Sequence, residues 1–151
     1  TNDHLINYYL KNNDLEKLKE EKENQKKKNK DIIKTFEQTW SLSNVYFFYS
    51  NYSNEIVQND FTHVFNSKHN ILNDTEKKNL KNNFLIGYIG KTTGILKFDA
   101  LVLLNSNLKK MHGSLNIFVR TYKSFWVLKR RLTKTIQILE KKVKFQLSRI
   151  E

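Results

Sequence analysis

The segment Gly90-Lys91-Thr92 has the residue types of a phosphate-binding loop, in which a lysine and a hydroxyl follow a glycine. A complete loop has a further glycine five positions before this one, and the chain has Leu85 there. The loop must also lead into a helix, whose first backbone amides face the phosphates. Beyond Thr92, apolar and polar residues alternate, which predicts a strand. We therefore expect a turn here and no nucleotide hydrolysis.

Two further motifs occur in RNA-binding folds, but neither has its usual context. Gly87-Tyr88-Ile89-Gly90 has the GxxG spacing of a KH-type RNA clamp, yet strands rather than helices are expected around it. Phe118-Val119 with Tyr122 is similar to the aromatic strand of an RNA-recognition fold, without its glycine-aromatic surroundings. We predict that Phe118 and Tyr122 are packing residues.

The titratable side chains form no recognisable metal or catalytic set. Asp60, His63 and His69 have a spacing that matches no metal-ligand pattern. His112-Gly113-Ser114 offers a base and a hydroxyl, without a third member or an oxyanion device. The chain has no cysteine, so disulfides and thiolate chemistry are excluded. We predict surface histidines, no catalytic residue, no metal, no cofactor and no enzymatic activity.

The strongest functional signal is the distribution of charge. Residues 81–151 carry eleven lysines and four arginines against three acids, a balance of +12, whereas residues 1–80 carry twelve lysines and twelve acids. A basic surface of this kind is typical of nucleic-acid binding through phosphates, with little sequence preference. The alternatives are an acidic protein partner, a membrane surface, or a solvated helix face. The predicted RNA-binding residues are Lys109, Lys110, Arg120, Lys123, Arg130, Arg131, Lys134, Lys141, Lys142, Lys144 and Arg149.

The composition indicates an AT-biased genome. Asn, Lys, Ile, Phe and Tyr, which have AT-rich codons, are abundant, whereas Gly, Ala, Arg and Pro together supply only nine residues. Together with the basic half, this leads us to expect a mitochondrial, non-enzymatic structural protein of a ribonucleoprotein. The most fitting assembly is an organellar ribosome, with rRNA and neighbouring proteins as partners.

Two other functions stay open. The chain could be an accessory subunit of a mitochondrial respiratory-chain membrane complex, its basic helix lying against acidic subunits or anionic headgroups. A coiled-coil scaffold is disfavoured, because the apolar seam lapses between Leu18 and Ile32. The longest wholly apolar run is Ala100 to Leu104, so we expect no membrane span. No homo-oligomer is predicted.

The elements that must carry these residues indicate an α+β fold in a single domain, 1–151. A helical extension, 1–42, contains a long charged helix from Leu15 to Trp40, with Asn12-Asn13-Asp14 as its cap. The body, 43–151, is expected to hold an antiparallel sheet of three or four strands, including a hairpin at about 93–122. Short strands are predicted at 45–49 and 84–89, and Asn73-Asp74-Thr75 is predicted to cap a short helix.

The last predicted element is a long basic helix at about 123–150, packed on the sheet. Apolar residues recur there at spacings of three and four, which is typical of one helix face against a core. In the hairpin, Leu96, Phe98, Ala100, Val102 and Leu104 are expected to share one face, with Lys97 and Asp99 on the other. The cations of the helix are expected on the side opposite its apolar stripe.

Overall fold

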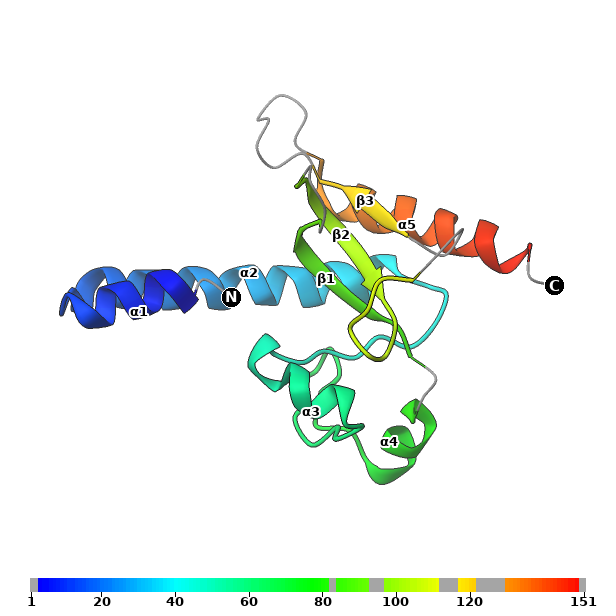
Figure 1. Cartoon of the computed structure of the whole chain (residues 1–151), viewed down its shortest axis with the longest axis horizontal. Coiled ribbons are helices and arrows are strands. Elements are labelled where there is room, and N and C mark those ends of the chain that lie inside the picture. Colours follow the sequence, from blue (N-terminus) through cyan, green and yellow to red (C-terminus); the bar gives the residue numbers. More distant parts are fainter. Residues whose placement is uncertain (1–2, 82–83, 93–96, 112–116, 122–129, 150–151) are drawn as a thin grey trace.

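A computed structural model describes residues 3–81, 84–92, 97–111, 117–121 and 130–149 of the chain. These ranges hold five α-helices, one 3-10 turn and a three-stranded antiparallel sheet, which confirms the predicted α+β class (Figure 1). In chain order the elements are α1 (Asp3–Lys11), α2 (Leu15–Thr39), η1 (Ser50–Tyr52), α3 (Ser53–Val57), α4 (Asp74–Leu80), β1 (Ile86–Lys91), β2 (Asp99–Leu104), β3 (Phe118–Arg120) and α5 (Leu132–Leu147).

The sheet has the order β1-β2-β3, so β2 is its central strand. Ile86 pairs with Leu104 and Lys91 with Asp99 across β1 and β2, while Ala100 pairs with Arg120 across β2 and β3. The predicted antiparallel pairing of the two hairpin strands is therefore confirmed. β1 pairs with the other edge of β2.

Strand β2 is buried on both faces, which the predicted alternation did not indicate. Ala100, Val102 and Leu104 join a core with Ile56 and other residues of segment 56–72. Leu101 and Leu103 face the opposite way, into a second core. A short run that is apolar at every position is typical of a strand covered on two sides. The sheet consequently separates two hydrophobic cores.

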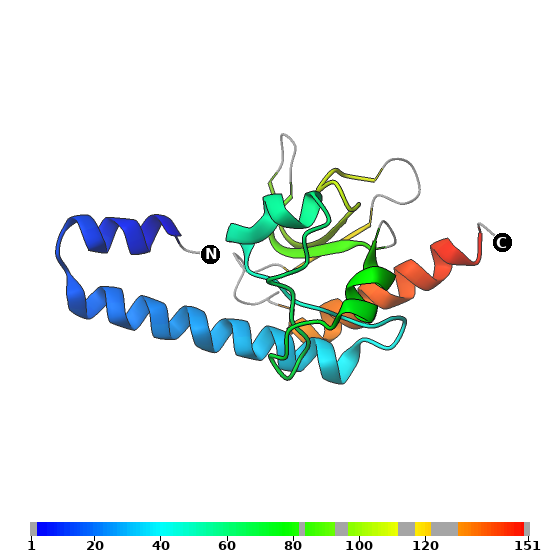
Figure 2. The ribbon, with the colours of Figure 1, turned by 90° about the horizontal axis from the view of Figure 1, so that it is seen from below.

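The second core joins the two long helices to the sheet. Ile136 and Leu139 of α5 are almost fully buried there, and Phe36 and Trp40 from the end of α2 pack against the same cluster. Figure 2 shows α2 and α5 on the same side of the sheet. α5 therefore has a fixed inner face, and its outer face is available for other contacts.

The N-terminal part of the chain forms a helical hairpin that projects from the body. Asp14 begins α2 as its cap, because its carboxylate accepts a hydrogen bond from the Lys17 amide at 3.2 Å. α1 folds back along α2, and both extend away from the sheet (Figures 1 and 2). The predicted projecting helix and its cap are confirmed. None of the helices in the described ranges has both the length and the apolar character of a bilayer crossing.

Helix α5 begins later than predicted. The sequence pattern indicated a helix from about residue 123, but Arg130 and Arg131 are not helical and α5 starts at Leu132. The Arg130 amide instead donates to the Thr121 carbonyl at 3.0 Å, which extends the edge of β3. Residues 122–129 lie outside the described ranges. The apolar periodicity continues through Arg130, so it could not reveal this change of backbone direction.

Segment 45–49 is not a strand, contrary to the prediction. Only Phe47 forms a bridge, with Phe65, and Phe65 forms another with Ile71. Tyr46 and Phe48 pack on the first core, and the Phe47 ring contacts those of Phe36 in α2 and Phe65. The predicted cap at Asn73 is confirmed: its side chain accepts from the Glu76 amide at 2.9 Å, and Glu76 bonds back to the Asn73 amide.

Candidate nucleic-acid interface

Helix α5 presents lysines on the side opposite its buried face. Ile136 and Leu139 point into the core, and the helical repeat of ~100° per residue turns Lys134, Lys141 and Lys144 outward. All three side chains are exposed. We call these three residues the α5 lysine face. Among the described residues, no carboxylate lies within ion-pair distance of any of the three.

The carboxylate of α5, Glu140, is bound by Ser41, and the nearby charge of Lys144 also lowers its pKa. Glu140 accepts hydrogen bonds from the Ser41 amide at 2.7 Å and the Ser41 hydroxyl at 2.6 Å. These bonds, above all the one from the hydroxyl, lower the pKa of the Glu140 carboxyl. The negative charge of α5 therefore fastens the helix to the turn after α2. The α5 lysine face is left with an unbalanced positive potential.

The start of α5 adds to that potential. Arg131 is the N-cap residue, its side chain is exposed, and it makes no capping hydrogen bond to the first amides of the helix. Lys134 follows within the first turn. Free helix amides together with nearby cations favour anions such as phosphate.

Two of the predicted RNA-binding residues close the open edge of β3 instead. Phe118 and Arg120 direct their carbonyls away from β2, since residues 117, 119 and 121 pair with that strand. Lys142 Nζ donates to the Phe118 carbonyl at 3.0 Å, and Arg130 Nη1 donates to the Arg120 carbonyl at 2.8 Å. Cations on an edge strand block pairing with other chains.

The remaining predicted cations do not form one cluster. Arg120 is exposed and stacks over the Phe98 ring at 3.7 Å, whereas Lys110 bridges to Leu104 at the opposite end of β2. Lys109 is exposed in the same turn as Lys110. Arg149 lies past the end of α5 with its guanidinium 5.6 Å from the Phe145 ring. Lys123 lies outside the described residues.

The other motifs considered in the sequence are placed as ordinary structure. Gly90 and Lys91 end β1, and Lys91 forms an ion pair with Asp99 at 3.1 Å. His63 stacks on Tyr52 at 4.0 Å and lies 3.7 Å from Glu55. No group of three metal-binding side chains occurs within the described ranges. Phe118 packs on the first core, as predicted. Tyr122 and the segment 112–114 are not among the described residues.

Sequence reasoning missed a groove along α2. It is lined by lysines at Lys22, Lys26 and Lys30, and by the rings of Tyr49 and His69. The zero net charge of residues 1–80 concealed this groove, because a charge summed over a segment does not show which lysines share one side of a helix. The four-residue spacing of these lysines was the signal that could have revealed it.

Comparison with models of protein families, with curated proteins and with solved structures gives no match to this chain.

Proposed function

We propose that the chain is a non-enzymatic structural component of a ribonucleoprotein and that it contacts RNA through the α5 lysine face. The observation that carries the proposal is the arrangement of α5. Its apolar side is fixed on the sheet, its carboxylate is bound to Ser41, and its lysines are exposed, with none of them in an ion pair among the described residues. In RNA, the phosphate oxygens supply negative charge that pairs with these lysines.

The fold supports a structural role rather than a catalytic one. The second core holds α5 against the sheet, and the hairpin of α1 and α2 extends away from the body. A chain of this shape can bind RNA with one helix and reach neighbouring proteins with the other. The AT-biased composition makes a mitochondrial ribosome the assembly that we propose.

We propose a smaller set of RNA-binding residues than the sequence predicts. The α5 lysine face and Arg131 are exposed, and we assign phosphate contact to them. Arg130 and Lys142 already donate to carbonyls of β3, so we assign their main role to the sheet edge. These assignments make the two groups experimentally separable.

The test is whether RNA holds the chain in its native particle. The particle is treated with ribonuclease, and the chain is followed by sedimentation and immunodetection. We expect the chain to leave the particle when RNA is digested and to stay after mock treatment. Retention with respiratory-chain proteins after full digestion of RNA would contradict the proposal and support an accessory membrane-complex subunit.

A further inference from the structure

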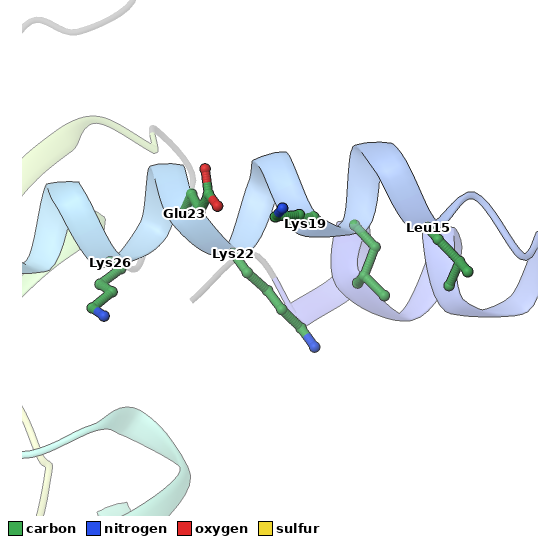
Figure 3. A pocket seen from close by; sticks show the side chains of 6 residues that line it. Leu15, Lys19, Lys22, Glu23 and Lys26 are labelled. Carbon is green, nitrogen blue, oxygen red and sulfur yellow. The ribbon is translucent and has the colours of Figure 1, made fainter.

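Two adjoining grooves run along one side of α2. The first has a volume of about 310 Å³ and is lined by Leu15, Leu18, Lys19, Lys22, Glu23 and Lys26 (Figure 3). The second has a volume of about 330 Å³ and is lined by Lys22, Gln25, Lys26, Asn29, Lys30, Ile33, Tyr49 and His69. Both are lined by Lys22 and Lys26, so they adjoin on the surface of α2, and we call the two together the α2 groove.

The α2 groove is positive although the N-terminal half of the chain is neutral. Lys22, Lys26 and Lys30 follow one another at four-residue intervals, a rise of ~6 Å each, and therefore form a stripe on the helix. Glu20, Glu21 and Asp31 fall more than ~100° around the helix from Lys26, and Glu23, ~60° from it, is the one carboxylate among the residues that line the α2 groove. Figure 3 shows Lys22 and Lys26 extending on the same side of α2, with the Glu23 carboxylate pointing away from them.

An aromatic stack closes the body end of the α2 groove. Phe65 is buried, and its ring contacts that of Tyr49, at 5.5 Å with an interplanar angle of 41°, and that of His69, at 5.2 Å with an angle of 20°. Both outer residues are exposed, Tyr49 by 42%. An exposed ring supported from behind by a buried one is a surface on which a nucleobase can stack.

The turn that carries His69 is held in place before any ligand arrives. Asn66 Oδ1 accepts from the amides of Lys68 and Asn70 at 3.0 and 3.1 Å. The Ser67 hydroxyl donates to Glu37 Oε1 at 2.5 Å, which ties the turn to α2. His69 itself has a φ of 63°, a left-handed conformation that is uncommon outside glycine. Such backbone strain is found at binding sites, where the surrounding structure maintains it.

We propose that the α2 groove binds a short single-stranded RNA segment. Its phosphates lie along the stripe of Lys22, Lys26 and Lys30, and an unpaired base stacks on the exposed ring of Tyr49 or of His69. A lysine track that ends in exposed rings is the combination by which proteins hold single strands, since every base has a face that can stack. A duplex offers no free base to the rings. This site is on a different element from the α5 lysine face, so either can fail without the other.

The test measures binding of single-stranded oligouridine and of an RNA duplex to the full chain. One variant replaces Lys22, Lys26 and Lys30 by Gln, and its matched control replaces Lys27, Lys28 and Lys34, exposed lysines of α2 that do not line the α2 groove. We expect the first variant to weaken oligouridine binding about tenfold or more and the control to weaken it far less. Duplex binding should change little in both.

A second variant separates stacking from charge. Tyr49→Ala should weaken oligouridine binding about tenfold, whereas Tyr49→Phe, which keeps the ring, should bind like the wild type. In the unmodified chain, ultraviolet irradiation of the complex should give uridine adducts on the peptides that contain Tyr49 or His69. The proposal is overturned if adducts map only to α5, or if the control lysine variant loses as much oligouridine affinity as the groove variant. The proposal would also be overturned if an acidic peptide displaced oligouridine and Tyr49→Ala had no effect on oligouridine binding.

Discussion

At the scale of single residues, Glu140 is the one carboxylate of α5, and it bonds to the turn that follows α2. Its carboxylate accepts two hydrogen bonds from Ser41, and these stabilise the ionised form. A carboxyl whose pKa is lower in the folded than in the unfolded chain stabilises the fold above the unfolded pKa, ~4.3 for glutamate. That stability is lost as the pH falls through the lower, folded pKa.

We therefore expect Glu140→Gln to lower the free energy of unfolding by about 1 kcal/mol at neutral pH, because a hydrogen bond to a charged acceptor is replaced by a weaker one. The difference from the wild type should shrink as the pH falls through the acidic range. Urea unfolding at a series of pH values measures both effects. A stability difference that does not change with pH would show that the ionised carboxylate is not the stabilising form.

Residue types also determined which local features could be predicted. The caps at Asp14 and Asn73 depend only on side chains that accept from amides a few residues away, so the sequence alone indicated them. The contact between Ser41 and Glu140 joins residues 99 positions apart, and no local pattern encodes it. The α2 groove is likewise made by residues from α2 and from two distant turns.

At the scale of elements, neighbouring lysines of α5 have different roles. Lys142 donates to the β3 edge, whereas Lys141 is exposed on the α5 lysine face. We expect Lys142→Gln to cost about 1 kcal/mol of stability and to promote self-association through the uncovered strand edge. Lys141→Gln removes the same charge and should change the stability by less than about 0.5 kcal/mol.

Urea unfolding and light scattering on the two single variants provide the comparison. RNA affinity should show the opposite ranking, with the larger loss in Lys141→Gln. Equal stability losses in the two variants would contradict the assignment of Lys142 to the sheet edge.

Strand and helix boundaries show where periodicity stops being informative. The alternation across 96–104 predicted the strand, but it did not indicate that Leu101 and Leu103 meet a second core formed by α2 and α5. The three-and-four spacing predicted α5 but placed its start too early, because Arg130 bonds to Thr121 and leaves the helix pattern. Both errors arise from tertiary contacts that override local preference.

At the scale of the whole molecule, two positive surfaces sit on two different helices. The α5 lysine face is on the helix packed under the sheet, and the α2 groove is on the helix that projects from the body (Figure 2). Composition predicted a basic C-terminal half but no basic site in the neutral half, since net charge says nothing about which side of a helix carries it. The α+β class could be predicted from the spacing of apolar residues along the sequence. That the two cores lie on opposite faces of β2 could be seen only in the structure.

The most direct test of RNA contact by the α5 lysine face is the salt dependence of RNA affinity. Binding is measured between about 50 and 200 mM salt for the wild type, for a variant with Lys134, Lys141 and Lys144 changed to Gln, and for the Lys27, Lys28 and Lys34 control. Each lost phosphate contact lowers the slope of log affinity against log salt by ~0.7 to 0.9. We expect the α5 variant to lose about 2 from the slope and the control to keep it. Salt-independent binding by the wild type, or equal slopes in all three proteins, would contradict contact between α5 and RNA.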